Sequence, residues 1–119
     1  MINTMKKTLI QMLLLLLPIT AAIAAGSASA TNVFVIDVRT EAEWNAGHLE
    51  SAILIPHDRI GADIAKVVVD KKSRIYLYCR SGRRTAIAAD VLKRSGYQNL
   101  TNLGTMDNAA RVLNMRIVK

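Results

Sequence analysis

From residue 33 onward, short apolar runs alternate along the chain with segments whose apolar residues repeat at helical spacing. Four runs rich in aliphatic and β-branched residues predict buried strands: 33–38, 51–55, 74–78 and 100–103. Helices are predicted around them, over 41–46, 58–68, 86–95 and 107–113. Strands and helices that alternate with short connections are typical of a single open α/β domain, with a mostly parallel sheet flanked by helices.

Capping residues mark the expected ends of these helices. Thr40 precedes Glu43 by three positions, which is a capping box, and Gly47 is expected to stop that short helix. Asp58 and Asp107 are expected to cap the second and the last helix.

Two further expectations concern the second half of the chain. Ile87, Val91 and Leu92 share one side of helix 86–95, so that side is expected to be buried. Gly104 follows the last apolar run and is expected to end the strand there.

Residues 1–30 differ in composition from the rest and predict a secretory signal peptide. Two lysines near the start precede an apolar stretch over 9–25, and Ala28-Ser29-Ala30 is an A-x-A cleavage pattern. Cleavage after Ala24 is one alternative, and an uncleaved membrane anchor is another, although the apolar stretch is near the lower length limit for a span. Removal of the peptide would leave residues 31–119 as one small exported domain.

The chain is basic, with a formal net charge of +7, which favours anionic partners. Nucleic acid is not expected among them, because the basic residues are scattered and no aromatic residues interleave with them. Most of the charge is expected to lie on a solvated face, and small anions remain as candidate ligands.

Cys79 is the only cysteine of the chain, so it cannot form an intramolecular disulfide. In an exported domain such a cysteine is either a buried core residue or a reactive thiol. The loop that follows it, between strand 74–78 and the next helix, is Arg80-Ser81-Gly82-Arg83-Arg84-Thr85. This order directs backbone N–H groups and the positive end of a helix dipole at the loop. With three arginines nearby, we expect a reactive thiolate with a lowered pKa.

A thiolate surrounded by amides and guanidinium groups can attack an electrophilic centre carried by an anion. Two chemistries use this layout. Phosphoryl transfer needs a loop wide enough for a tetrahedral oxyanion, whereas sulfur transfer needs a tighter loop around a terminal persulfide.

The loop from Cys79 to Thr85 resembles the active-site loop of the rhodanese, or thiosulfate sulfurtransferase, family. Further segments resemble that family's signatures: Asp37-Val38-Arg39, Glu43-Trp44, Gly47-His48-Leu49, Ser51-Ala52, Ile55-Pro56, Gly96-Tyr97 and Asn102-Leu103. The resemblance covers about residues 33–104 and implies a rhodanese-like fold. A short, exported, single-domain chain is most similar to the periplasmic type of this family, which implies a periplasmic location.

The length of the loop separates the two chemistries. The spacing from Cys79 to Arg84 is Cys-x4-Arg, whereas cysteine phosphatases use Cys-x5-Arg, and here that position holds Thr85. The resemblance therefore implies a two-step sulfur transfer, in which Cys79 takes the outer sulfur of thiosulfate as a persulfide and a thiophilic acceptor, cyanide or a thiol, removes it. A cysteine phosphatase or arsenate reductase, a non-enzymatic sulfur carrier and a redox thiol are the alternatives.

The resemblance also implies roles for other residues. Cys79 is the expected nucleophile, and substrate binding is expected from the rest of the loop: Arg80, Ser81, Gly82, Arg83, Arg84 and Thr85. Not all three arginines can point inward, and Arg84 is a candidate for bracing the loop. Thr85 is expected either to cap the following helix or to bond the thiolate.

Three polar residues outside the loop are expected to give structural support. Asp37 and Arg39 are expected to hold the sheet end and the loop together. His48 is expected to be hydrogen-bonded rather than to act as a general base, because a thiolate with a lowered pKa needs none. We predict no metal, because the two histidines and one cysteine lack ligand spacing. No cofactor is expected, and the mature domain is expected to be a monomer free of the membrane.

The sequence departs from the family pattern at both ends. The family usually has an extra strand and helix before the Asp37-Val38-Arg39 segment, and here only Thr31 and Asn32 would precede it after cleavage. The family usually has paired glycines and a tryptophan after Asn102-Leu103, where this chain has Gly104-Thr105-Met106.

Overall fold

A computed structural model describes residues 32–119, and the predicted signal peptide lies outside the described residues. Thr31–Lys119 forms one compact unit. Its elements follow one another as β1 (Val33–Asp37), α2 (Glu41–Ala46), β2 (His48–Leu49), β3 (Ile53–Leu54), α3 (Ile60–Val67), β4 (Arg74–Cys79), α4 (Arg83–Arg94), β5 (Asn99–Thr105), α5 (Met106–Leu113) and β6 (Ile117–Val118). The predicted α/β architecture is confirmed.

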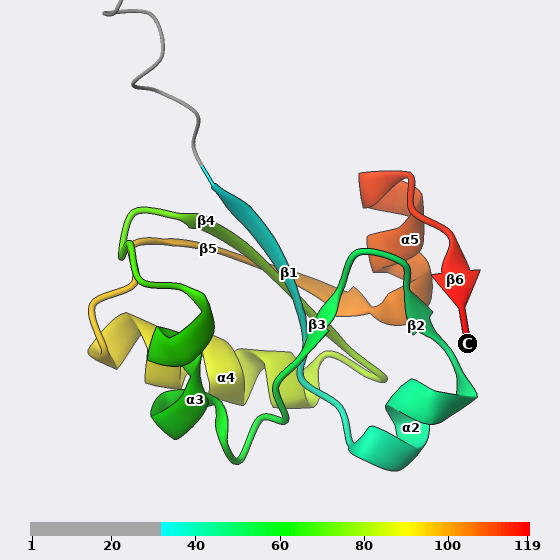
Figure 1. Cartoon of the computed structure of the whole chain (residues 1–119), viewed down its shortest axis with the longest axis horizontal. Coiled ribbons are helices and arrows are strands. Elements are labelled where there is room, and N and C mark those ends of the chain that lie inside the picture. Colours follow the sequence, from blue (N-terminus) through cyan, green and yellow to red (C-terminus); the bar gives the residue numbers. More distant parts are fainter. Residues whose placement is uncertain (1–31) are drawn as a thin grey trace, which may run out of the picture. The chain divides into compact units, whose positions relative to one another are not determined.

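Four strands form the main sheet in the order β3-β1-β4-β5, and every neighbouring pair is parallel. The two central strands, β1 and β4, are long and apolar, which suits strands covered on both faces. In Figure 1, α3 and α4 lie together on one side of this sheet and α5 lies on the other. Ligands of such sheets bind beyond the carboxyl ends of the strands, and β4 ends at Cys79.

Alternation along the strands divides the core into two apolar clusters, one on each face of the sheet. Ile36, Ile75 and Leu77 face α3 and α4, and they pack with Ile64 and Leu92. The opposite face holds a second cluster, in which Val35, Tyr78 and Leu103 pack with Leu49 and Ala109. Cys79 belongs by register to the first cluster, so its side chain lies on the same face as α4.

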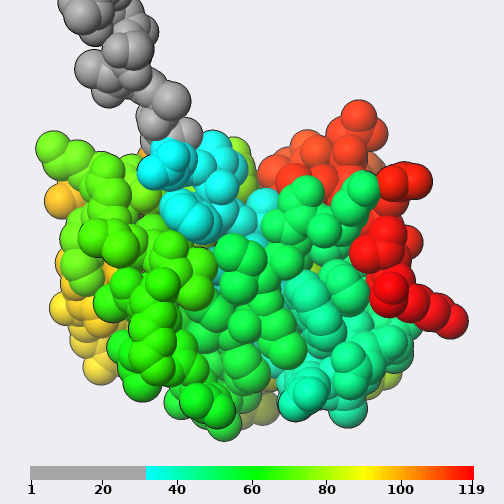
Figure 2. Space-filling view, in the orientation of Figure 1, coloured from blue at the N-terminus to red at the C-terminus, as the bar shows by residue number. Residues whose placement is uncertain are grey.

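A two-stranded antiparallel sheet of β2 and β6 was not anticipated from the sequence. Its strands are two residues long, and His48 pairs with Val118 while Leu49 pairs with Ile117. Tyr78 ties this sheet to the centre of the domain, because its hydroxyl accepts a hydrogen bond of 3.0 Å from the Leu49 N–H. In the space-filling view, the C-terminal segment covers one edge of the visible face beside the residues of α2 and β2 (Figure 2).

The capping box at α2 is confirmed, because the Thr40 side chain accepts from the Glu43 N–H while Glu43 reaches back to the Thr40 N–H. Gly47 ends this helix as predicted. The prediction that Asp58 caps α3 is wrong, because Arg59 is the N-cap residue. The backbone already turns between Pro56 and Arg59 through an N–H to carbonyl bond of 2.9 Å, so Asp58 lies inside the turn, one residue too early.

The last helix also differs from the expectation. Thr105 rather than Asp107 is its N-cap residue, and the Thr105 hydroxyl oxygen accepts from the Asn108 N–H at 3.1 Å. Asp107 lies within the first turn, where a carboxylate favours the helix dipole without capping it.

Helix α4 begins at Arg83, three residues before the expected start. Its buried residues are Thr85, Ala88 and Leu92, which are spaced by three and four along one face. Ile87 was expected to be buried and is 45% exposed, because it lies beside that stripe rather than on it.

The sequence led us to expect that strand β5 ends at Gly104. The strand instead continues to Thr105 through an irregularity. Leu77 pairs with Asn102, whereas Cys79 pairs with Thr105, so β5 carries one extra residue at this point. Gly104 has φ of 72°, a left-handed conformation that favours glycine. The bulge brings Thr105 and the start of α5 beside Cys79.

Within residues 32–119, no helix combines the length and the apolar composition that crossing a bilayer requires.

The hydrogen bond from Leu49 to Tyr78 gives a test of the packing. We expect Tyr78→Phe to lower the free energy of unfolding by about 1–3 kcal/mol, because a buried N–H loses its acceptor. Urea denaturation measures the loss. Tyr76→Phe is the matched control, since the Tyr76 hydroxyl makes no hydrogen bond within the described residues, and an equal loss in both variants would contradict this account.

Candidate active site

Cys79 is the last residue of the central strand β4, and a turn of three residues separates it from α4. Gly82 makes this turn possible, because it is the N-cap residue of α4 and has φ of 90°. A Cβ there would also lie 3.5 Å from the Gly104 Cα, so the turn and the β5 bulge pack closely. The cysteine therefore sits at the N-terminal end of a twelve-residue helix.

The Sγ atom of Cys79 receives hydrogen bonds from this turn. The Gly82 N–H donates to it at 2.9 Å, and the Thr85 hydroxyl lies 3.7 Å away. Burial raises the pKa of the Cys79 thiol, but hydrogen bonds from the Thr85 backbone and hydroxyl, and from Gly82 and Ser81, lower it by more. The resulting pKa lies below the ordinary value of a cysteine, which favours the thiolate.

Burial and reactivity were alternatives for Cys79 in the sequence, and the structure shows features of both. Cys79 has no exposed surface and packs against the apolar cluster beneath α4. It also lines the cavity at the carboxyl ends of the strands. A fully apolar environment would raise the pKa of the thiol, so the polar hydrogen bonds to Sγ distinguish this cysteine from an inert core residue.

Thr85 lies in the first turn of α4 and is completely buried. Its hydroxyl lies 2.7 Å from the Gly82 carbonyl oxygen and 3.7 Å from Sγ, and its single proton can be donated to either acceptor. The hydroxyl thus contacts both the turn and the sulfur, whereas the N-cap position belongs to Gly82.

Arg84 does not line the cavity and forms a bidentate ion pair with Glu43 of α2, with N–O distances of 2.6 and 2.9 Å. Hydrogen bonds from Arg84 and Thr40 lower the pKa of Glu43 to about 2, although partial burial acts in the opposite direction. This ion pair joins the loop after Cys79 to the helix that follows β1.

Asp37 and Arg39 form a second, buried bidentate ion pair at the carboxyl end of β1, with the shortest N–O distance at 2.7 Å. Arg39 also donates to the Gly47 carbonyl at 2.7 Å. The pair therefore connects the end of the strand to the end of α2.

The remaining loop residues differ in position. Arg80 is exposed and lines the cavity beside Cys79. Ser81 and Arg83 are exposed but do not line the cavity, and within residues 32–119 their side chains make no ion pair or hydrogen bond. Of the three arginines, only Arg80 is thus placed to meet a ligand over the sulfur.

His48 does not line the cavity. Its ring stacks on Trp44 with a centroid distance of 3.5 Å, and its Nδ1 lies 3.0 Å from the Trp44 carbonyl oxygen. These contacts hold the start of β2 against α2. In the part of the chain that the structure describes, no three His, Cys, Asp or Glu side chains cluster as metal ligands would.

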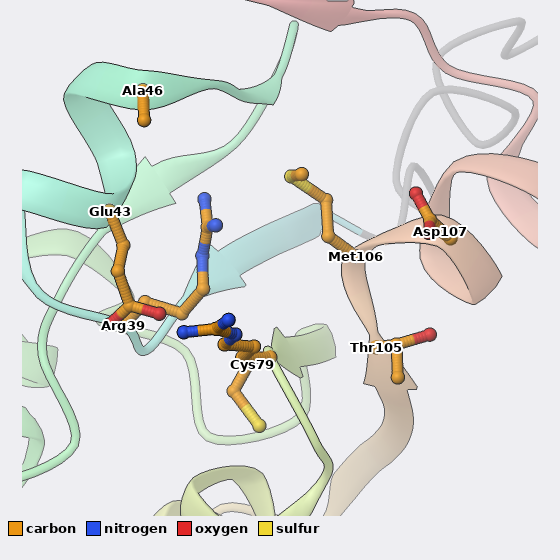
Figure 3. Close-up of a pocket in the computed structure, with 8 residues that line it drawn as sticks. Arg39, Glu43, Ala46, Cys79, Thr105, Met106 and Asp107 are labelled. Atoms are coloured by element: carbon orange, nitrogen blue, oxygen red, sulfur yellow. The ribbon is translucent and has the colours of Figure 1, made fainter.

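The cavity has a volume of about 400 Å³ and opens above Cys79. Arg39, Glu43 and Ala46 lie on one side in Figure 3, and Thr105, Met106 and Asp107 on the other, with Cys79 between and below them. The second wall was not predicted as part of the site. The feature that could have revealed this wall is the parallel pairing of β4 with β5, because neighbouring parallel strands end at the same edge of a sheet.

These features define an α/β protein with an activated cysteine in a strand–turn–helix loop at the carboxyl end of its sheet. The rhodanese-like domain family matches residues 20–105, a span that begins within the predicted signal peptide. The chain therefore belongs to the rhodanese-like family.

Relatives with curated names support this assignment. The chain is 33% identical over 75 residues to the thiosulfate sulfurtransferase PspE of Escherichia coli (strain K12). The matched region covers 63% of this chain and 72% of that protein. It is 32% identical over 76 residues to a sulfurtransferase of Allochromatium vinosum, and the matched region covers 64% of this chain and 69% of that protein. A solved rhodanese with anions from E. coli superposes with a TM-score of 0.67 at 32% identity, covering 73% of this chain and 98% of that one. Sulfur transfer is thus the class of reaction that the relatives support.

The contacts of Sγ predict the effect of one substitution on the thiol pKa. We expect Thr85→Val to raise the pKa of Cys79, because valine keeps the shape but removes the hydroxyl that stabilises the thiolate. The ultraviolet absorbance of the thiolate, followed against pH, measures this pKa in a buried group. Thr85→Ser keeps a hydroxyl and is the control; an unchanged pKa in Thr85→Val would refute the role of the hydroxyl.

The ion pair between Glu43 and Arg84 predicts a pH-dependent stability. Because the Glu43 pKa is lower in the folded chain, its contribution is complete above about pH 4.5 and is lost as the pH falls toward 2. We expect Glu43→Gln, which preserves the capping box, to lose about 1–2 kcal/mol of unfolding free energy at pH 7. The difference from wild type should shrink with acidification.

Urea denaturation at pH 7 and at low pH measures both quantities. Glu41→Gln is the matched control, since Glu41 lies in the same turn of α2, is exposed and has no ion pair within the described residues. A difference between wild type and Glu43→Gln that stays constant with pH would contradict the assigned pKa.

Proposed function

We propose that this protein is a thiosulfate sulfurtransferase that carries one sulfane sulfur on Cys79 and passes it to cyanide or a thiol. One observation carries the proposal: Cys79 lines the cavity, and hydrogen bonds from the amides of the turn and of α4 to its Sγ atom lower the pKa of the thiol. Membership of the rhodanese-like family and the named sulfurtransferases among the relatives support the same chemistry.

In the first half-reaction the Cys79 thiolate attacks the outer sulfur of thiosulfate. A new S–S bond forms to Sγ, the bond within thiosulfate breaks, and sulfite leaves with the electron pair. The N–H groups that hold the thiolate can donate to the terminal sulfur of the persulfide in the same way. No external base is required, because the nucleophile is already deprotonated.

The roles of the arginines follow from their partners. Arg80 lines the cavity and is proposed to bind the donor dianion. Arg84 is proposed to brace the loop through Glu43, and Asp37 and Arg39 to hold the adjacent strand end. Arg83 lies outside the cavity and adds only to the positive potential that attracts anions.

The loop length favours sulfur over phosphate. Four residues separate Cys79 from Arg84, and the turn places the Gly82 amide directly on Sγ. A phosphoryl group needs several donors spread around three oxygens, whereas a terminal sulfur needs only a narrow ring of amides.

We also propose that residues 1–30 are a cleaved signal peptide and that the mature domain acts in the periplasm as a monomer. The composition of the N-terminus and the similarity to short single-domain members support this location.

The central experiment follows the mass of the protein and the product together. We expect intact-mass analysis to show a gain of one sulfur after thiosulfate and its loss after cyanide, with thiocyanate formed at each turnover. Cys79→Ser should abolish both signals, because a serine hydroxyl is neither ionised nor thiophilic at neutral pH. Thiocyanate production by this variant would contradict the proposed nucleophile.

The same experiment separates the alternatives. A non-enzymatic carrier would gain one sulfur yet release thiocyanate at a negligible rate. A phosphatase would hydrolyse p-nitrophenyl phosphate without gaining sulfur from thiosulfate.

A further inference from the structure

The cavity above Cys79 is lined by four charged side chains, and within residues 32–119 only two of them have ionic partners. Arg39 is neutralised by Asp37, and Glu43 is neutralised by Arg84. The other two, Arg80 and Asp107, form no ion pair or side-chain hydrogen bond with any described residue. Besides the sulfur of Cys79, the cavity therefore presents one unpaired cation and one unpaired anion among its described lining residues.

These two residues come from different elements. Arg80 directly follows β4, whereas Asp107 lies in the first turn of α5, which the bulge in β5 brings to the site. Figure 3 shows Asp107 and Met106 on the wall opposite Arg39 and Glu43. Together, the lining offers a positive group, a negative group and the thioether of Met106 above the sulfur.

The donor does not explain this arrangement. A cavity of about 400 Å³ falls within the range of roughly 300–1,000 Å³ that is usual for small organic ligands, and it exceeds what one tetrahedral anion needs. Thiosulfate is a dianion, so Asp107 can only repel it. The carboxylate suits the second half-reaction, in which the acceptor enters.

We propose that the acceptor is a small zwitterionic amino thiol of the cysteine class, and that Asp107 determines this specificity. The ammonium group of the acceptor would face Asp107, and its carboxylate would face Arg80. The thiol would then reach the sulfane sulfur on Cys79. This inference rests on the proposed sulfur transfer and specifies its second substrate.

The proposed step is balanced without a further reagent. The acceptor thiolate attacks the terminal sulfur of the Cys79 persulfide, and a new S–S bond forms on the acceptor. The bond between Sγ and the terminal sulfur breaks, and its electron pair returns to Cys79 as the thiolate. The amides of the turn stabilise that leaving group as they stabilise the resting thiolate.

A structural role could also account for Asp107, because an acidic residue in a first helical turn favours the helix dipole. A purely structural role would leave the choice of acceptor unaffected. The test therefore measures relative rates among acceptors that differ only in charge.

The experiment first loads wild-type protein with sulfur from thiosulfate and removes the excess. The loss of sulfur is then followed by intact mass with four acceptors: L-cysteine, cysteamine, 3-mercaptopropionate and 2-mercaptoethanol. The same rates are measured for Asp107→Asn and for Asp58→Asn. Asp58 is exposed and does not line the cavity, so its variant controls for the change in net charge.

We expect Asp107→Asn to lower the rate ratio of L-cysteine to 3-mercaptopropionate by about two- to fivefold, as for a partly hydrated charge pair. Comparing the variant with wild type cancels the intrinsic reactivities of the thiols. Asp58→Asn should leave the ratio unchanged. Arg80→Gln should instead lower the ratio of L-cysteine to cysteamine, which lacks the carboxylate.

The possible failures are distinguishable. If thiosulfate does not load wild-type Cys79, the proposed function fails and this inference fails with it. If loading succeeds but Asp107→Asn leaves the ratio unchanged, only the inference is overturned. A reduced protein thiol that accepts sulfur far faster than L-cysteine, with the ratio again unchanged, would also overturn it.

Should Asp107→Asn not fold, a variant that keeps Asp107 still tests the proposal. In Arg80→Gln, which removes the competing cation, the ratio of cysteamine to 3-mercaptopropionate should fall with added salt, because salt screens the exposed Asp107. A ratio that does not change with salt would overturn the inference.

Discussion

The site depends on one set of interactions, the backbone N–H groups that the turn between β4 and α4 directs at the sulfur of Cys79. A parallel sheet places the end of β4 at the edge where ligands bind, and Gly82 allows the chain to reverse into a helix there. The amide at 2.9 Å and the buried Thr85 hydroxyl then outweigh the cost of burial for a thiolate. Without this turn, Cys79 would be an ordinary member of the apolar core.

Two ion pairs surround this turn without touching the sulfur. The pair of Asp37 with Arg39 lies at the end of the neighbouring strand, and the pair of Glu43 with Arg84 joins the loop to α2. Because both are bidentate and partly or wholly buried, they fix side-chain geometry better than exposed pairs do. They also neutralise Arg39 and Arg84. Among the described residues that line the cavity, Arg80 is then the arginine whose charge is available to a ligand.

Most of the fold could be predicted from the sequence because its signals are local. The apolar runs of β1 and β4 and the box of Thr40 and Glu43 occupy consecutive or nearby residues. The strands β2 and β6 could not be predicted, since two residues carry no periodicity and their pairing joins His48 to Val118. The site divides in the same way: Cys79 and its loop were evident, whereas the wall from Thr105 to Asp107 depends on a bulge that only the folded sheet reveals.

The irregularity at Gly104 lies between the regularly paired part of β5 and the wall of the cavity. Changes in sequence at this point can therefore alter the wall without altering the rest of the sheet. Because side chains alternate between the faces of a strand, one extra residue reverses the face on which everything after it lies. In this chain the extra residue lies between the pair of Leu77 with Asn102 and the pair of Cys79 with Thr105, so it precedes the wall that faces the sulfur. Insertions or losses at this single position in related chains would therefore exchange one set of wall residues for another while the sulfur and its amides stayed in place.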